Sequence, residues 1–388
     1  MDRLIVKNFG PLKDIDIELN KINLFIGENG SGKSVLAKLI TILLDYEELS
    51  DKKFINDLKY YNINFLNENT EIKFLIENEN IFEYINGKIV YNNLINTLEV
   101  TLKPIKEEIK NIIYNIKDRD NLPVDELKKI IYVAKEYKVI GEDKLSNLET
   151  YIRTLEKLKS QYLPAERNLI SVLNKSLSSL IISDIPLPKF LLKFASEYEK
   201  ARDEIKELSF LNVRYENSDI DRIYYNKENY LTLEQSSSGI QSALPMFLTT
   251  KYFAQKYRTI VIEEPEQNLF PEAQVEAVKF IIEQIDRNNL FLMTHSPYVL
   301  STLNILMMAH KVGSLSSKAS KEVEKIIPKS KWLNRDNFSA YYIEDGKAKN
   351  IKGKTGLISE NVIDDISDEI DSEFQELLEL YREFKNDK

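Results

Sequence analysis

The chain has 388 residues, 43% of them hydrophobic, with a formal net charge of −9 and an isoelectric point near 5.2. This length accommodates one large or two ordinary domains with a sizeable core. The acidic balance argues against a protein coated in positive charge, although it leaves room for a local basic patch. The absence of cysteine excludes disulfides, cysteine-based zinc sites and cysteine nucleophiles.

The N-terminal region reads as antiparallel β-structure around a tight turn at residues 9–11. Asn86-Gly87 is a strong hairpin signal between two of the expected strands. The expected strands are residues 3–7, 15–19, 71–76, 81–85 and 88–91. Because the chain begins in a strand pattern, without a signal peptide or an apolar run near the ~20 residues of a membrane span, we expect a cytoplasmic protein.

Residues 22–44 carry the strongest motif of the chain. A short apolar strand (22–26) leads into G-x-x-x-x-G-K-[ST], and apolar residues spaced for one face of a helix follow. In such a loop, backbone N–H groups cradle phosphates, Lys33 reaches the β- and γ-phosphates, and Ser34 binds Mg²⁺. The alternative is a plain glycine-rich turn. The expected nucleotide-binding residues are Gly27, Asn29, Gly30, Ser31, Gly32, Lys33, Ser34 and Val35.

The middle of the chain predicts helices inserted into this α/β framework. Residues 104–160 are charged and helical, interrupted at 121–123 and at Gly141. A second helical insertion spans 167–208, with helices expected at 167–182 and 189–208. Strand patterns follow at 211–215, 222–225 and 230–233.

The C-terminal half alternates strands and helices. Apolar strands are expected at 259–262 and 290–293, and the segment 311–331, rich in Lys and Ser, as a surface loop. A hairpin is expected at 345–346, and an acidic, helical tail from about 359. The expected helices run from the 235–239 cluster to about 257, from 271 to 286 and from 297 to 310.

Two adjacent carboxylates, Glu263 and Glu264, end the strand at 259–262. In a P-loop enzyme one acid holds Mg²⁺ and the next prepares the attacking water. We assign Glu263 to the metal and Glu264 to the water. The alternative is an acidic strand end on the surface.

His295 follows the strand at 290–293, where its imidazole could hydrogen-bond a γ-phosphate. A capping or buried histidine is the alternative, and His310 has no motif around it. Ser238 and Gly239 open a different helix and predict a second anion site, which favours a nucleotide shared between two subunits. A simple serine N-cap is the alternative here.

In this order the motifs resemble the ABC-type ATPase heads of the SMC, RecF and double-strand-break-repair group. More narrowly, they resemble compact bacterial AAA ATPases related to OLD proteins, many of them in phage-defence operons. The resemblance covers about residues 1–350. It implies an α/β P-loop NTPase head with a mixed central sheet, an antiparallel β subdomain and helical insertions. Beyond the resemblance, the residues themselves predict an acidic, helical tail at 351–388.

The resemblance also implies further roles. Ser238 and Gly239 match the signature residues that reach the partner's γ-phosphate, and residues 267–269 match the D-loop. Gln161 lies near the Q-loop position. Arg167 belongs to a Tyr-x-Pro-Ala-Glu-Arg block that recurs in the compact group, without an assigned role.

Some features depart from the family pattern. Glu263 stands where Asp is usual, Ile240 replaces the second signature glycine, and residues 168–235 fit only short helices rather than a long coiled coil. The roughly 90 residues after His295 are too few for the rest of a head plus a Toprim domain. The acids at 364–369 fit a solvated or partner-binding helix face better than a metal site.

These features predict a Mg²⁺-dependent ATPase that forms a homodimer around ATP and works in DNA maintenance or antiphage defence with a separate nuclease or toxin effector. The alternative is a regulatory scaffold that binds ATP, holds such a partner and turns over slowly. Direct duplex binding is a third option, which the acidic balance weakens.

Overall fold

The computed structural model describes residues 2–45, 51–91, 160–173, 187–218, 220–285 and 287–358, together with four residues of the tail. The expected helical insertion at 104–160 lies outside these residues except for Ser160. In the tail, Ser372, Phe374, Gln375 and Leu377 are helical and exposed. None of the helices in the described ranges is long and apolar enough to cross a membrane.

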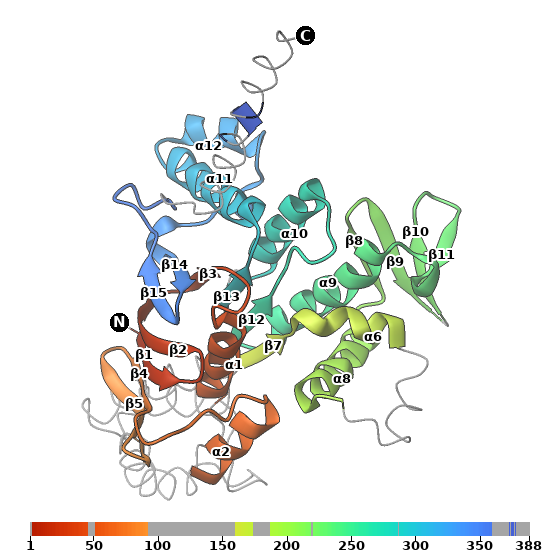
Figure 1. The fold of residues 1–388 in the computed structure, drawn as a ribbon. Helices are drawn as coiled ribbons and strands as arrows, with labels where there is room; N and C mark the ends of the chain where they lie inside the picture. The colour runs from red at the N-terminus through yellow and green to blue at the C-terminus, as the bar shows by residue number, and fades with distance from the viewer. Residues whose placement is uncertain are drawn as a thin grey trace, which may run out of the picture.

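An eleven-stranded sheet runs through the molecule, and one half of it is parallel (Figure 1). β3 and β12 are buried along their whole length, as continuous apolar runs predict for a sheet covered on both faces. From the middle of the sheet outward, the parallel strands are β14 (Phe338–Glu344), β3 (Ile22–Ile26), β13 (Asn289–Thr294), β12 (Thr259–Glu263) and β7 (Ser160–Leu163).

The other half is antiparallel and is joined to the first through β15 (Lys347–Asn350), which pairs with β14 and touches β2. Its outer strands meet at the predicted hairpin, where Asn86 and Gly87 take positive φ of 52° and 73°. The five strand predictions in this region are confirmed. From the edge inward the strands are β6 (Lys88–Tyr91), β5 (Glu79–Ile85), β4 (Glu71–Ile76), β1 (Asp2–Phe9) and β2 (Leu12–Leu19).

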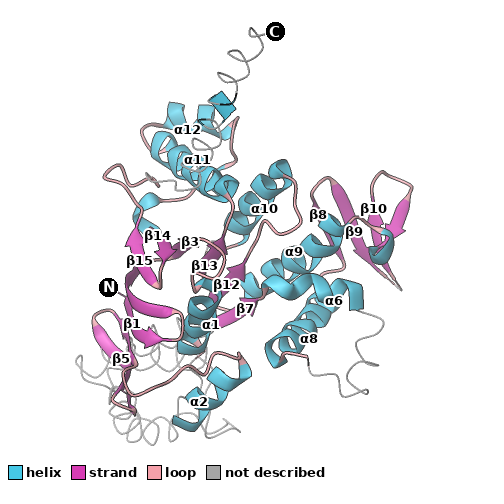
Figure 2. Cartoon of the chain, in the orientation of Figure 1, coloured by secondary structure: helices cyan, strands magenta, loops and turns pink. Residues whose placement is uncertain are grey.

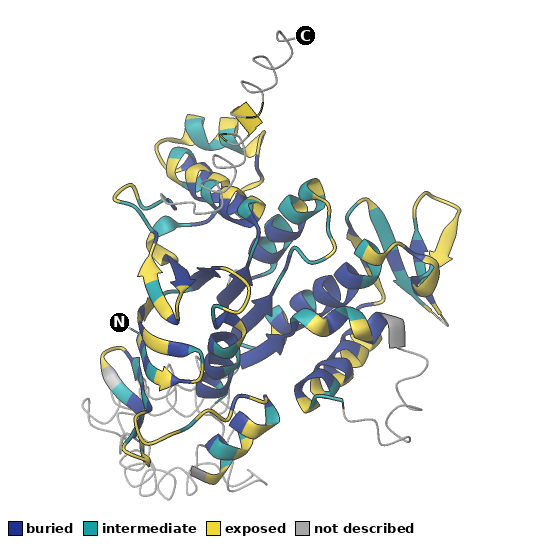
Figure 3. Ribbon diagram, in the orientation of Figure 1, coloured by how far each residue is buried: buried dark blue, intermediate teal, exposed yellow. Residues whose placement is uncertain are grey.

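Helices cover the parallel strands (Figure 2). α1 packs on β12, β7 and β13, and α9 packs on β12 and β7. Burial is concentrated in these strands and in α1 (Figure 3). The helices are α1 (Lys33–Leu44), α2 (Asp51–Tyr60), α6 (Asn168–Leu173), α8 (Lys189–Glu204), α9 (Ser238–Lys256), α10 (Pro271–Gln284), α11 (Pro297–Gly313) and α12 (Ser317–Glu324).

A separate four-stranded antiparallel sheet precedes α9. Three of its strands were predicted, but the strand at 207–210 was not. The helix predicted over 189–208 ends at Glu204, and this strand begins three residues later. Leu208 and Phe210 alternate with exposed residues there, a period of two that argues for a strand. The strands are β8 (Glu207–Phe210), β9 (Val213–Asn217), β10 (Asp221–Tyr224) and β11 (Tyr230–Thr232).

Two other predictions differ from the structure. Residues 160–163 form β7, a strand that the mixed polarity of these four residues did not predict. The segment 311–331 is not a loop, because α11 continues to Gly313 and Ser316 caps α12 by accepting a hydrogen bond from the Ala319 N–H. Short 3₁₀ turns complete the fold at η1 (Ala165–Arg167), η2 (Leu233–Gln235), η3 (Lys329–Lys331) and η4 (Arg335–Asn337).

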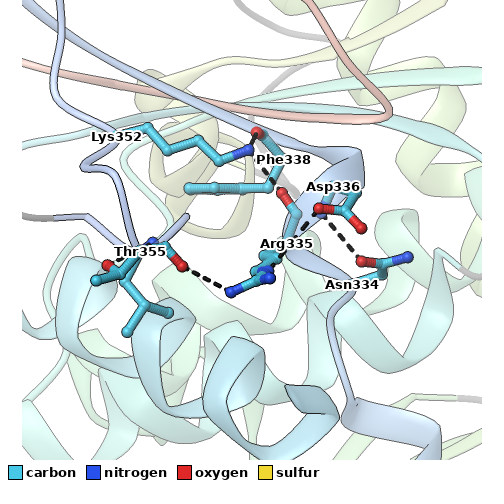
Figure 4. A network of polar contacts seen from close by, with 7 residues as sticks. Asn334, Arg335, Asp336, Phe338, Lys352 and Thr355 are labelled. Carbon is cyan, nitrogen blue, oxygen red and sulfur yellow. Dashed lines mark hydrogen bonds and ion pairs between the residues drawn. The ribbon is translucent and has the colours of Figure 1, made fainter. Parts of the chain in front are cut away.

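Packing onto the head continues beyond residue 350. Lys352 Nζ donates to the carbonyls of Arg335 and Phe338, both at 2.7 Å, and Arg335 donates to the Thr355 carbonyl at 2.8 Å (Figure 4). Asn304 on α11 exchanges two hydrogen bonds with the backbone of Ile358. The last described segment before the tail is therefore tied to both β14 and α11.

Candidate nucleotide-binding and hydrolysis site

The P-loop joins β3 to α1 with the geometry that the motif requires. A Cβ at Gly27 would collide with the Ile343 carbonyl oxygen, and Gly32 has a φ of 104°, so both positions need glycine. Gly32 also serves as the N-cap of α1 without any side-chain hydrogen bond. The first N–H groups of α1 therefore have no side-chain cap, as an anion site at a helix N-terminus requires.

Lys33 lies back over its own loop. Its Nζ donates to the carbonyls of Gly27 and Glu28, both at 2.8 Å, and to Ser31 Oγ at 3.2 Å. Burial lowers the pKa of Lys33 to about 8, against the pull of the nearby carboxylates. Asn29 and Gly30 are exposed at the tip of the loop, and Val35 is half-buried on α1.

Ser34 and Glu263 meet, although 229 positions separate them in the sequence. Ser34 Oγ donates to Glu263 Oε2 at 3.0 Å, and Tyr162 on β7 donates to Oε1 at 2.9 Å. Glu263 is only 3% exposed, and burial raises its pKa to about 7. Sequence reasoning missed Tyr162, because its strand was not recognised.

The hydroxyl and carboxylate oxygens of Ser34 and Glu263 are ligands that Mg²⁺ prefers. In the described part of the chain no group of three or more His, Cys, Asp or Glu residues could hold a metal by itself. An ion at Ser34 and Glu263 would therefore complete its shell with water and phosphate oxygens, as Mg²⁺ does in nucleotide-binding enzymes. The residues present fit this ion.

Glu264 sits in a turn directly after β12. Its φ is +45°, an uncommon conformation for a residue with a side chain, and its N–H donates to the Met293 carbonyl at 2.8 Å. Gln267 Nε2 donates to Glu264 Oε2 at 3.3 Å. The turn thus gives the two neighbouring carboxylates different surroundings, one buried on Ser34 and one half-buried beside Gln267.

His295 follows β13 and lies close to the P-loop, because its imidazole is near enough to the Gly27 backbone and the Lys33 ammonium for both to affect its pKa. Burial, and then the charge of Lys33, lowers the pKa of His295. At neutral pH the ring is therefore neutral and has one donor and one acceptor nitrogen. The strand before His295 pairs with the P-loop strand β3, as expected, and the contact of His295 with a γ-phosphate stays a prediction.

Ser238 and Gly239 lie at the start of α9, with Ser237 Oγ as a weak N-cap at 3.4 Å from the Ile240 N–H. A Cβ at Gly239 would lie 3.0 Å from the Asn268 carbonyl, and Ser242 Oγ donates to the Gln267 carbonyl at 3.3 Å. In this chain the signature segment therefore contacts the 267–269 segment. No hydrogen bond among the described residues joins it to the P-loop of the same chain.

Gln161 lies inside β7, not in a loop. Its neighbours Ser160 and Tyr162 point toward α1 and Glu263, with Ser160 Oγ donating to the Thr41 carbonyl at 2.8 Å. Side chains alternate along a strand, so Gln161 points to the opposite face of the sheet, where it is 3% exposed. In this arrangement the side chain of Gln161 faces away from Ser34 and Glu263.

Two further charged residues, the buried Arg167 and the half-buried Glu266, contact the turn and the end of β13. Arg167 is 1% exposed, and its Nη1 donates to the carbonyls of Pro164 at 3.1 Å and Glu263 at 2.6 Å, while Nη2 donates to the Glu264 carbonyl. Glu266 Oε1 accepts from Thr294 Oγ1 at 2.8 Å and from the His295 N–H at 2.7 Å. Sequence reasoning gave Arg167 no role and passed over Glu266.

Comparisons with known proteins agree with this geometry. Residues 1–300 match the family model described as an AAA ATPase domain. The chain is 25% identical to the OLD nuclease of Thermus scotoductus, over 76% of this chain and 59% of that protein. It is also 25% identical to the endonuclease GajA of Bacillus cereus, over 97% of this chain and 70% of GajA. The chain thus spans only part of the length of these relatives.

Solved structures with a similar trace share little sequence. One is the Smc head domain of Pyrococcus furiosus bound to the C-terminal domain of ScpA, with a TM-score of 0.36 and 13% identity over 90% of this chain and 96% of that one. Another is an ATP-binding cassette of an ABC transporter in its ADP conformation, with a TM-score of 0.35 and 13% identity over 92% of this chain and 93% of that one. Neither likeness bears on function.

Three observations indicate an AAA ATPase domain: the P-loop geometry, the strand order around it and the family match over residues 1–300. The predicted relation to OLD proteins is confirmed by the two curated relatives. The chain belongs to the AAA ATPase domain family.

Proposed function

We propose that this protein hydrolyses ATP with Mg²⁺ and that two copies enclose the nucleotide between them. The observation that carries the proposal is the 3.0 Å contact between Ser34 Oγ and Glu263 Oε2 at the carboxyl end of β12, with Glu264 next to it. This contact unites a phosphate-binding loop with two carboxylates, the parts that in-line attack of water on a γ-phosphate needs.

Each residue has a defined task in this proposal. The P-loop N–H groups and Lys33 bind the phosphates, and the Lys33 ammonium stabilises the charge that builds up on the γ-phosphate. Glu264 orients the attacking water and accepts its proton. Neutral His295 donates a hydrogen bond to the γ-phosphate. Mg²⁺, held by Ser34 and Glu263, would neutralise phosphate charge.

The dimer proposal rests on the exposed signature segment. Ser238 is exposed at the start of α9, and its neighbours Gly239 and Ser242 contact the 267–269 segment. A second copy that presents Ser238 and the α9 N-terminus would add anion-binding groups to the first copy's nucleotide. ATP then stabilises the dimer by mass action.

Glu264→Gln tests the water-activating role. Gln keeps the size of the side chain but lacks the basicity to take a proton, so we expect turnover to fall on the order of 10²-fold or more while ATP binding survives. Size-exclusion chromatography with Mg-ATP should then show a trapped dimer. Glu263→Gln should instead weaken Mg²⁺ binding and so raise the Mg²⁺ concentration that hydrolysis needs. Normal hydrolysis by Glu264→Gln, or no ATP-dependent change in size, contradicts the proposal.

Ser238→Arg tests the contribution in trans. We expect it to block turnover and ATP-induced dimerisation while the isolated monomer still binds ATP, because the added side chain fills the place of the partner's phosphate. Ser209→Arg, at another exposed serine on β8, serves as the matched control and should behave as wild type. Loss of ATP binding by monomeric Ser238→Arg would show that the residue acts in its own subunit.

For the wider context we propose antiphage defence or DNA maintenance with a nuclease or toxin effector. Support comes from the names of the relatives, a nuclease and an endonuclease, which describe those proteins. A turnover number at background combined with tight ATP binding would favour the regulatory scaffold instead. Affinity for duplex DNA measured across salt concentrations would test direct binding, because phosphate contacts produce a steep slope.

A further inference from the structure

Arg167 is a fully buried cation without a task in the chemistry proposed above. In the part of the chain that the structure describes, its hydrogen bonds all go to backbone carbonyls, those of Pro164, Glu263 and Glu264. It lies at the end of η1, directly after β7, so it bridges the ends of β7 and β12. A guanidinium has donors in a rigid fork and can hold two successive carbonyls at once, which an ammonium on a flexible stem cannot do with the same geometry.

The carbonyls that Arg167 holds belong to the two carboxylate residues themselves. Between them the backbone leaves the extended conformation of β12 and enters the left-handed region at Glu264, with φ +45°. A residue with a side chain persists in that region only where its surroundings enforce it. The two contacts from Arg167 and the Glu264 N–H bond to the Met293 carbonyl supply that enforcement.

Glu266 holds the end of the neighbouring strand β13 in a similar way. It lies two residues beyond Glu264, and one of its oxygens accepts from both Thr294 Oγ1 and the His295 N–H. Its other oxygen, Oε2, is buried without a hydrogen-bond partner in the protein, as is Arg167 Nε. Among the charges around Arg167, that of Glu266 is the strongest stabiliser of the guanidinium.

Stability alone does not account for such a pair. Taking a guanidinium and a carboxylate out of water costs more than their mutual attraction commonly returns, and apolar residues of similar volume are often as stable or more so. Both charges, however, contact the segments that carry Glu264 and His295. Their placement therefore fits a role in geometry better than a role in folding.

We infer that Arg167 and Glu266 are positioning residues for ATP hydrolysis, which hold the Glu264 turn and the His295 backbone in the arrangement that the reaction needs. The inference rests on the proposed ATPase function. In this role neither side chain needs to touch the nucleotide. Arg167 acts through the carbonyls of Glu263 and Glu264, and Glu266 acts through the backbone of His295.

The test compares Arg167→Lys, Arg167→Met and Glu266→Gln with wild type by steady-state ATPase kinetics and equilibrium ATP binding. A shift of about 1 Å in a catalytic group costs on the order of 10²-fold in rate, so we expect kcat to fall by that order in each variant. The Kd for ATP should stay within roughly threefold, because the phosphate-binding groups are untouched. Arg167→Lys should retain more activity than Arg167→Met, since it keeps the charge and part of the hydrogen bonding.

Arg202→Lys is the matched control. Arg202 is a half-buried arginine on α8, and it pairs at 2.8 Å with Asp221 on β10 of the small sheet. We expect this change to leave kcat as in wild type. If it lowers kcat as much as Arg167→Lys does, general loosening of the fold explains both, and the inference fails.

Combining each change with Glu264→Gln isolates the mechanism. If Arg167 acts through Glu264, then Arg167→Lys should cost much less in the Glu264→Gln background than in wild type, because the two residues act as one unit. Equal costs in both backgrounds overturn the inference for Arg167. Should Arg167→Lys and Arg167→Met fail to fold, Glu266→Gln decides alone: wild-type kcat, or kcat and ATP affinity lost in parallel, overturns it. A wild-type protein without ATPase activity would instead refute the proposed function.

Discussion

In the parallel half of the large sheet, β3 and β12 are buried on both faces, whereas in the antiparallel half β1 and β2 alternate buried and exposed residues. The parallel strands all direct their carboxyl ends to one edge, and this edge holds Glu263, Glu264, His295 and the P-loop. The antiparallel strands end at opposite edges and bring no such set together.

The two halves of the sheet therefore differ in role: the parallel half carries the proposed active site, and the antiparallel half stabilises the fold. A parallel arrangement needs helical crossovers, so segments far apart in the sequence end side by side and loops of the same edge share one site. An antiparallel meander stabilises the head through local pairing instead. Changes at the carboxyl ends of the parallel strands should therefore alter activity, and changes in the antiparallel half should alter stability.

Lys33→Ala should have the largest effect of the variants that test the parallel half of the sheet. We expect ATPase activity to fall by about 10³-fold or more, because the γ-phosphate loses its fixed cation, while the unfolding temperature without nucleotide changes little. Lys7→Ala on β1 is the control, and it should hydrolyse ATP as wild type does. Wild-type ATPase activity in Lys33→Ala would remove the P-loop from the mechanism.

Phe74→Ala should have the opposite profile. Phe74 is 2% exposed on β4, where it pairs with Leu4 and Phe82, and its truncation should destabilise the fold by about 3–5 kcal/mol. At a temperature where the variant is folded, kcat should match wild type. Denaturant unfolding beside ATPase kinetics measures both, with the exposed Val90→Ala as the control. A folded variant with strongly reduced kcat would show that the two halves are coupled.

Tyr162→Phe and Tyr215→Phe sharpen the comparison, because each removes a buried tyrosine hydroxyl that donates to a carboxylate. Tyr162 donates to Glu263 at 2.9 Å and Tyr215 to Asp221 at 2.8 Å. Each change should destabilise the protein by about 1–3 kcal/mol. Only Tyr162→Phe should also raise the Mg²⁺ concentration needed for half-maximal ATPase activity. The same Mg²⁺ response in both variants would show that Tyr162 does not orient Glu263 for Mg²⁺ binding.

Arg3→Ala should have the smallest effect of the set. Arg3 pairs with Asp16 at 2.6 Å across β1 and β2, but both side chains are 48% exposed, and solvent screens such pairs. We expect unchanged ATPase activity and no resolvable shift in the unfolding temperature. A clear loss of either would mean that this surface contributes more than an exposed ion pair does.

Much of this arrangement follows from the sequence. The P-loop, the apolar strands that end at Glu263 and Thr294, and the Asn86-Gly87 turn depend on neighbours within a few residues, so local spacing reveals them. The antiparallel strands likewise carry a period of two in their own residues.

The tertiary structure alone decided the rest. β7 is a strand because β12 pairs with it, and Tyr162 and Arg167 reach Glu263 only through that pairing, 101 and 96 positions away. The +45° φ of Glu264 follows from contacts with Arg167 and Met293, not from its own preference. Local patterns predict the secondary structure of a segment from its own residues. Buried charges and strained turns depend instead on contacts with residues distant in the chain, and only the folded sheet brings those residues together.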